Sequence, residues 1–456
     1  MNSGDTAWVL VSASMVLLMT PGLALFYGGM VRSKSVLNMM MMSFGAIGVV
    51  GVLWPLFGYS MAFGNDVGGG LLGNPGEFFG LNSLMGTNGL EGGFVSDDLV
   101  FTVPSTAFVA FQSVFAIITV ALISGAIADR AKFGTWLVFT AVWATVVYFP
   151  VAHWVFAFHG AESKVGGWIA TKLLVIDFAG GTAVHINAGA AGLALALVLG
   201  RRVGWQREPM RPHNLPLVMI GAGLLWFGWF GFNAGSALAA NGQAAEVFVN
   251  TFVATCAAML GWLVTEKVRD GHATSLGGAS GVVAGLVAIT PSCSAVSPLG
   301  AIVLGAVAGV LCALAVGLKY KLGFDDSLDV VGVHLVGGVV GTVAIGFVGT
   351  AAATAGVDGL LYGGGVDQLW RQAGGAGAVL AYSFILTFVI GYALQKTIGF
   401  RLDEEDEVTG IDSVAHAEAG YDFAQSFGGV RAATIASATT TTSVDVPVDH
   451  MESVDA

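Results

Sequence analysis

The feature that most restricts the fold of this chain is a series of eleven long apolar stretches. About 20 apolar residues in a helix are needed to cross the hydrocarbon core of a bilayer. Only 11% of the residues are charged, against about a quarter in soluble domains. We therefore predict an all-α integral membrane protein with eleven transmembrane helices. The predicted spans are residues 6–31, 36–63, 101–128, 133–156, 178–199, 215–236, 247–264, 276–289, 298–317, 330–350 and 374–395.

Lysine and arginine are distributed unevenly between the segments that connect these spans. Of 18 such residues, 15 fall on one side of the predicted membrane and three fall on the other. Positive charge is retained on the cytoplasmic side of membrane proteins. We therefore expect a multi-pass protein of the cell (plasma) membrane with its N-terminus outside and its C-terminus cytoplasmic. The first span has no basic region before it, so we expect it to be retained and not removed as a signal peptide.

The net charge of −12 comes mainly from the end of the chain. Residues 1–398 form the predicted transmembrane domain and are nearly neutral, whereas residues 399–456 form an acidic tail. Neither part has the clustered Lys and Arg that nucleic acids require, so we expect no nucleic-acid partner. The three cysteines lie in apolar stretches and predict no disulfide framework. Motifs of hydrolases, phosphate-binding loops and metalloproteases do not occur, so we expect no cofactor, no metal and no enzymatic activity.

Two short motifs recur five spans apart. The fifth span begins with DFAGGTAVHINAG (177–189) and the tenth with DVVGVHLVGG (329–338). Each has an aspartate near its start, a histidine in its apolar body and a glycine four residues after the histidine. Because five is odd, equivalent spans would run in opposite directions, which is the inverted repeat of many transporters. We expect pseudo-repeats over about residues 6–200 and 215–350, followed by a final helix over about 374–395.

Ionisable side chains inside a span are costly and often functional. Here they are mainly His185 and His334, with Asp177 near a span end. If the two imidazole rings meet, they could share a proton while remaining largely neutral. The alternative is that each ring is neutral and bound to backbone or to a hydroxyl group. Asp177 could cap the first turn of its helix or stabilise a nearby cation, and Asp329 has the same two interpretations.

Aromatic residues are concentrated in the third and sixth spans. Phe111 and Phe115 lie one helical turn apart on one face, and WFGWFGFNAGS (226–236) combines rings with small residues. Aromatic stripes of this kind usually pack between helices. The alternative is a vestibule whose ring faces attract a cation above an apolar constriction.

Several motifs together resemble the ammonium transporter family, the Amt/Mep/Rh superfamily, and most closely its microbial Amt branch. These are the two histidine motifs, GWFGFNAGS (228–236), PGLALFYGG (21–29) and GIDSVAHAE (410–418), so the resemblance covers nearly the whole chain. It implies an eleven-span fold with a 5+5 inverted repeat and a final helix. It also implies a homotrimer in the lipid bilayer with one pore per subunit.

The resemblance assigns roles to pore residues. Phe115 and Phe232 match two stacked phenyl rings that close the external vestibule. His185 and His334 match twin pore histidines. Trp229 matches an aromatic residue of the pore wall.

The resemblance also assigns a recruitment site for ammonium. Asp177 matches an acidic residue beneath this site, and Ser236 matches a hydroxyl that lines it. In PVAHWVF (150–156), Phe156 stands where the family motif usually has tryptophan. Phenylalanine gives a weaker cation–π surface and no indole donor, so we expect looser recruitment, and Trp154 is not expected to substitute. The predicted substrate-binding residues are Phe111, Phe115, Phe156, Ser236 and Asp177.

The tail retains residues of the family motif at Gly410, Asp412, His416 and Glu418. The resemblance therefore implies that a PII-type regulatory protein docks on the cytoplasmic face. The Thr- and Ser-rich extension beyond about residue 421 has the composition of a disordered segment.

We therefore predict a transporter that recruits ammonium at an external vestibule, deprotonates it and conducts ammonia into the cytoplasm, with proton relay along the twin histidines. The first alternative is an ammonium sensor that signals through the tail. The second is a redox protein with haem on His153, His185 or His334, which a visible absorption spectrum tests.

Overall fold

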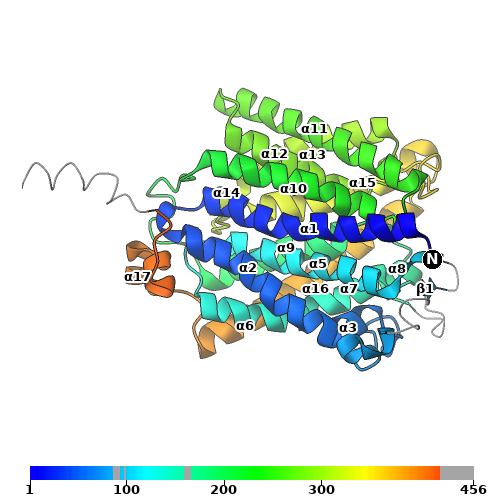
Figure 1. Ribbon diagram of the computed structural model, residues 1–456. Helices are drawn as coiled ribbons and strands as arrows, with labels where there is room; N and C mark the ends of the chain where they lie inside the picture. The colour runs from blue at the N-terminus through cyan, green and yellow to red at the C-terminus, as the bar shows by residue number, and fades with distance from the viewer. Residues whose placement is uncertain (86–92, 97–98, 159–165, 422–456) are drawn as a thin grey trace, which may run out of the picture.

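Long helices run side by side through the molecule (Figure 1). This computed structural model describes residues 1–85, 93–96, 99–158 and 166–421. The amino terminus and the tail helix α17 (Glu404–Thr409) lie at opposite ends of the bundle. This arrangement agrees with an odd number of membrane crossings.

In the described part of the chain, ten helical segments are long and apolar enough to cross a membrane. An eleventh, α12 (Ser275–Ile289), is apolar but has only 15 residues. The observed helices thus confirm the predicted all-α membrane fold. The α-helices of the ten segments are α1 (Ser3–Met30), α2 (Val36–Leu53), α3 (Tyr59–Phe63), α5 (Ser105–Ile123), α6 (Phe133–Trp143), α7 (Phe149–Phe156), α9 (Asn187–Leu199), α10 (Leu215–Gly235), α11 (Gly242–Asp270), α13 (Pro298–Ala315), α14 (Leu318–Leu322), α15 (Val336–Val348) and α16 (Asp367–Thr397).

Four of the membrane segments contain a stretch of π-helix, which the apolar pattern did not predict. The π-helical stretches are Trp54–Gly58, Ala144–Tyr148, Gly181–Ile186 (η6) and Val331–Leu335 (η7). The last two carry His185 and His334. Because π-helical turns are rare and concentrate at functional sites, their position at both histidines marks this part of the bundle.

The third span begins later than its apolar run predicts. The strands β1 (Gly93–Ser96) and β2 (Leu99–Pro104) pair in antiparallel fashion. Helix α5 therefore begins at Ser105 and not at residue 101. The run before Ser105 is rich in β-branched residues, which favour strands, and Pro104 lacks the N–H that a continuing helix needs. A short helix, α8 (Trp168–Thr171), precedes the fifth span.

Small residues allow the helices to approach closely. A Cβ atom on Gly221 of α10 would lie 2.3 Å from the backbone N of Phe26 in α1. A Cβ atom on Gly305 of α13 would lie 2.1 Å from the carbonyl oxygen of Ala254 in α11. The abundant glycine therefore serves backbone-to-backbone packing, as is common between membrane helices.

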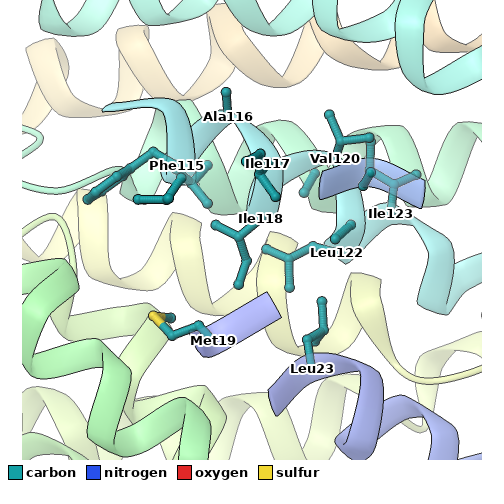
Figure 2. Close-up of a cluster of buried hydrophobic side chains, with 14 of the residues drawn as sticks. Met19, Leu23, Phe115, Ala116, Ile117, Ile118, Val120, Leu122 and Ile123 are labelled. Atoms are coloured by element: carbon teal, nitrogen blue, oxygen red, sulfur yellow. The ribbon is translucent and has the colours of Figure 1, made fainter. Parts of the chain in front are cut away.

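Helix α5 lies in the middle of the bundle and forms a wall of the central region. Its side chains from Phe111 to Ile123 are almost all buried. Figure 2 shows Ile118 and Leu122 facing Met19 and Leu23 of α1. A helix that is apolar on every side belongs in the interior, and α5 fits that description.

The first part of the tail is ordered against the helix ends. The carboxylate of Asp412 accepts hydrogen bonds from the backbone N–H groups of Leu37 (2.9 Å) and Asn38 (2.8 Å), and so it caps the start of α2. The Nε2 of His416 lies 3.0 Å from Oδ1 of Asn38. The predicted disorder beyond about residue 421 concerns residues 422–456, which lie outside the described residues.

Candidate functional site

The first histidine segment begins at a fully engaged carboxylate. Asp177 is 9% exposed and accepts five hydrogen bonds at the start of η6. Its donors are the backbone N–H groups of Gly180 (2.8 Å), Gly181 (2.6 Å), Thr182 (2.7 Å) and Ala183 (3.2 Å), and the hydroxyl of Thr182. An anion at a helix start satisfies the free amides and interacts favourably with the helix dipole. The structure therefore places Asp177 as the cap of the helix that carries His185.

The second histidine segment is capped by Asp326. Its carboxylate accepts hydrogen bonds from the backbone N–H groups of Val330 (3.1 Å) and Val331 (2.7 Å) at the start of η7. The interpretation of Asp329 as the helix cap was therefore wrong. Asp329 pairs instead with Nζ of Lys319 at 2.6 Å.

The spacing to the histidine explains this correction. Asp177 lies eight positions before His185, and Asp326 lies eight positions before His334. Asp329 lies only five positions before His334, so it cannot occupy the same place relative to the ring. The matching offset was present in the sequence, but the comparison of the two motifs began at the wrong aspartate.

The two histidines meet in the interior. The Nδ1 atoms of His185 and His334 are 3.3 Å apart, and their ring planes are inclined by only 17°. Both side chains are buried. One Nδ1 must carry the hydrogen while the other accepts it, so the pair holds one proton between them. Within the described part of the chain, Nε2 of His185 has no hydrogen-bond partner.

The indole of Trp229 lies parallel to the first of these rings. The centroids of Trp229 and His185 are 5.3 Å apart and the planes differ by 18°. The Nε1 of Trp229 donates to Oγ1 of Thr290 at 2.8 Å, which fixes the plane of the indole. Thr290 was not predicted as a site residue, because a lone threonine in an apolar span carries no sequence signal.

Stacked phenyl rings lie beside the histidine pair. The rings of Phe115 and Phe232 have centroids 4.1 Å apart and an interplanar angle of 24°, and both are 1% exposed. The rings of Phe111 and Phe115 pack edge to face, with their centroids 4.9 Å apart. Ser236 is partly exposed, and its hydroxyl donates to the carbonyl of Phe232 at 2.8 Å.

A narrow cavity of about 10 Å³ lies beside Phe232 and the two histidines. The surface that lines it is apolar. About this much space accommodates a single water-sized molecule. Its lining includes Phe232, Trp229, His185, His334, Ile118 and Leu122.

Comparison with known proteins agrees with this geometry. Residues 7–421 match the model of the Ammonium Transporter Family. The chain is similar to an ammonium transporter of Mycobacterium tuberculosis, with 65% identity over 441 residues that cover 94% of this chain and 92% of the relative. It is also similar to an ammonium transporter of Bacillus subtilis, with 45% identity, 92% of this chain and 99% of the relative covered.

The chain belongs to the ammonium transporter family. Solved structures of this family share the fold. The crystal structure of Candida albicans Mep2 matches with a TM-score of 0.79 and 32% identity over 89% of this chain and 88% of that chain. A structure named Sensor Amt Protein matches with a TM-score of 0.80 and 29% identity over 90% of this chain and 98% of that chain. This protein is therefore a multi-pass membrane transporter and not an enzyme.

In the described part of this ammonium transporter family member, Phe156 is not part of the group of contacting rings formed by Phe111, Phe115 and Phe232. Phe156 ends α7 and is partly buried against the apolar core. Among the described residues it makes no ring contact with Phe111 or Phe115. Trp154 also points elsewhere, because its Nε1 donates to the carbonyl of Leu71 at 2.8 Å.

Proposed function

We propose that this chain recruits ammonium at an external aromatic vestibule, removes one proton and conducts ammonia into the cytoplasm. The observation that carries this proposal is the buried histidine pair at 3.3 Å, placed beside stacked phenyl rings and a cavity of about 10 Å³. The names of the similar proteins support the same substrate.

The apolar lining supplies the selectivity. An ion that enters a dry cavity must give up its hydration, and an unpaired buried charge is strongly disfavoured. Potassium cannot lower this cost, whereas ammonium can release a proton and continue as neutral ammonia. Deprotonation leaves the electron pair on the nitrogen, so the species that passes Phe232 carries no net charge.

Recruitment is assigned to the external face of the rings. Phe111, Phe115 and the hydroxyl of Ser236 offer ring faces and one oxygen to a cation. Phe156 is included as the more distant aromatic surface. We place Asp177 beneath this region as the source of negative potential, and its carboxylate is held in place by five hydrogen bonds. We infer that Asp177 attracts the cation electrostatically and does not itself take the proton.

The histidine pair is proposed as the proton relay. Because Nδ1 of one ring faces Nδ1 of the other, a proton can pass between them without a fixed positive charge. His185 lines the cavity and its Nε2 has no hydrogen-bond partner among the described residues, so we infer that this nitrogen can accept the proton that ammonium releases. Trp229 holds the ring of His185 in this orientation.

The remaining proposals concern the location, assembly, internal repeat and regulation of the protein. We place the protein in the cell membrane as a homotrimer with its amino terminus outside, as the distribution of Lys and Arg supports. The equal spacing from Asp177 and Asp326 to their histidines supports the inverted repeat. The ordered tail around Asp412 supports a PII-type regulator on the cytoplasmic face.

An ammonium sensor is the second candidate function. Its supporting observations are the match to the structure named Sensor Amt Protein and the cap that Asp412 provides to α2. Ammonium flux, measured with the full chain and after removal of residues 403–456, distinguishes the two functions. A transporter should keep an ammonium flux, whereas a pure sensor shows no flux in either form.

The test uses proteoliposomes given an ammonium jump, an equal potassium jump and protein-free vesicles. We expect a saturable response to ammonium alone, recorded as a transient current or as internal alkalinisation. His185→Ala and His334→Ala should each abolish the current or admit potassium, whereas His272→Ala, at an exposed loop residue, should change neither. If both pore variants kept the wild-type flux and its discrimination against potassium, the relay would be excluded.

A further inference from the structure

The segment that leads to Asp177 is not helical. Residues 173–180 contain no helix or strand. Backbone groups near the membrane need partners, and irregular backbone persists only where other groups supply them. The N–H of Val175 donates to the carbonyl of Ile169 (3.2 Å), and that of Phe178 donates to the carbonyl of Pro291 (3.1 Å). Ile176, the residue after Val175, has a different partner.

Both backbone groups of Ile176 are bound by one side chain from α16. The N–H of Ile176 donates to Oε1 of Gln372 at 2.8 Å, and Nε2 of Gln372 donates to the carbonyl of Ile176 at 2.8 Å. The same Nε2 donates to the carbonyl of Thr342 in α15 at 3.0 Å. Oε1 also accepts a hydrogen bond from Nε2 of Gln368 at 2.9 Å. Gln372 is 0% exposed, and its amide makes all four hydrogen bonds that it can make.

Close packing around Gln372 confirms that this contact is tight. A Cβ atom on Gly375 of α16 would lie 2.7 Å from Cγ2 of Val175. A Cβ atom on Gly346 of α15 would lie 2.4 Å from Cα of Leu369. The amide therefore joins the segment before Asp177, the helix that continues from His334, and the final helix outside the repeat.

We propose that Gln372 is a positioning residue that determines where the Asp177 carboxylate lies and thereby how well the external mouth attracts a cation. This inference rests on the proposed function. Ile176 immediately precedes Asp177, so a rotation of its peptide plane moves the carboxylate relative to its five donors. The apolar pattern of α16 does not require a glutamine at this position, since packing alone would favour an apolar residue.

The neutrality of the amide also matters. An arginine or lysine in this place could bind the carbonyl of Ile176, but its positive charge would cancel the potential of Asp177 and repel the substrate. A glutamine holds both backbone groups and leaves the carboxylate as the dominant local charge. We therefore expect Gln372 to act on recruitment more than on the maximum rate.

The test compares Gln372→Met with Thr387→Val in full-length protein in proteoliposomes. Methionine keeps the length of the side chain but makes no strong hydrogen bond. Thr387 is buried on the same helix and accepts a hydrogen bond from Nε1 of Trp143 at 2.7 Å, far in sequence from the Asp177 segment. Its valine variant therefore removes a comparable buried contact of α16 without touching Ile176.

For Gln372→Met we expect the ammonium concentration for half-maximal response to rise about tenfold, with the maximum response within about twofold of wild type. Thr387→Val should leave the half-maximal concentration unchanged. A purely structural role would lower the maximum response of both variants and leave the half-maximal concentration of each as it is. That result, or an unchanged Gln372→Met, would overturn the proposal.

Hydrogen exchange measured by mass spectrometry separates this inference from the proposed function. In Gln372→Met, amides of the segment from Ile176 to Ala183 should exchange about tenfold faster than in wild type or Thr387→Val. If wild type showed no ammonium response, the proposed function would fail while the exchange result still decided the positioning role. Unchanged exchange in Gln372→Met would reject that role even if transport were normal.

Discussion

The two histidine segments begin in the same way but are held by different chemistry. In each, an aspartate lies eight residues before the histidine and caps a π-helical stretch. The residue before each aspartate has its carbonyl bound by a side chain from elsewhere in the chain. For Ile176 that side chain is the neutral Gln372, at 2.8 Å. For Asp325 it is Arg130, whose Nη2 lies 2.6 Å from the carbonyl oxygen.

The region around Asp325 contains a network of buried charges. Arg202 donates to both carboxylate oxygens of Asp325 at 2.9 Å and to Oδ2 of Asp129 at 3.2 Å. Arg130 and Asp325 are both 0% exposed. The two segments therefore differ in the charge of their partners: a neutral amide binds the residue before Asp177, whereas ion pairs surround the residue before Asp326.

The largest expected effect is on the stability of the region around Asp325. Arg202→Met removes the side chain that binds both carboxylate oxygens of the buried Asp325, so we expect a loss of about 3–5 kcal/mol. Thermal unfolding of the purified protein in detergent measures it. The matched control is Arg269→Met, which removes an ion pair of half-exposed side chains and should cause no measurable loss. An equal loss of stability in the two variants would show that burial does not make the Arg202 ion pairs more important than the exposed pair.

The second effect concerns the cap at Asp177. Asp177→Asn keeps the shape of the side chain but turns an NH2 group toward backbone donors, so we expect a loss of about 3 kcal/mol and an ammonium response too small to measure. Thermal unfolding and the proteoliposome assay test the two parts. Normal recruitment in this variant would contradict the electrostatic role of Asp177.

The equivalent change at the Asp326 cap should be milder. Burial raises the pKa of Asp326 to about 6, against the opposing charge of Lys319. Burial therefore disfavours the ionised form of this carboxylate. It accepts hydrogen bonds from two backbone N–H groups, whereas Asp177 accepts five hydrogen bonds. We expect Asp326→Asn to cost about 1 kcal/mol by the same unfolding assay. A cost equal to that of Asp177→Asn would remove the distinction between the two caps.

The smallest expected effect is the dependence of stability on pH that the Asp325 carboxyl contributes. Burial opposes ionisation of Asp325, but its hydrogen bond to Arg202 and the charge of Arg130 outweigh burial and lower the pKa of this carboxyl. Since the folded pKa lies below the unfolded value of 3.8, this stabilisation is present above about pH 4 and is lost as the pH falls through the folded pKa. We expect unfolding temperatures to be flat from pH 7 to about 5 with respect to this group.

The same measurement on Asp325→Asn supplies the control. That variant should be less stable at neutral pH and should lose the part of the acid dependence that this carboxyl contributes. An acid dependence in Asp325→Asn equal to that of wild type would contradict this role of the carboxylate.

Much of the site could be predicted because its residues belong to long motifs. His185, His334, Phe115, Phe232 and Trp229 were predicted as pore residues, and the structure brings these five together. Their roles in transport remain proposals.

Other parts of the site could not be predicted from local sequence. The cap at Asp326 was missed because the repeats were aligned on the wrong aspartate. Thr290 and Gln372 were missed because a single polar residue in an apolar span has no periodic or motif signal. The hairpin before Ser105 was missed because an apolar, β-branched run fits a strand and a membrane helix equally well.

The sequence by itself determined the all-α membrane fold and its ten or eleven apolar helices within the described residues. It also predicts an uneven distribution of Lys and Arg between the two sides. These follow from apolar length and from the positions of Lys and Arg, which act locally at each span. Only the tertiary structure decided which aspartates cap the histidine helices, which way the histidine nitrogens face, and that Gln372 binds Ile176 across 196 positions. Hydrogen bonds depend on distance and direction in three dimensions, and neither quantity is contained in the order of residues along the chain.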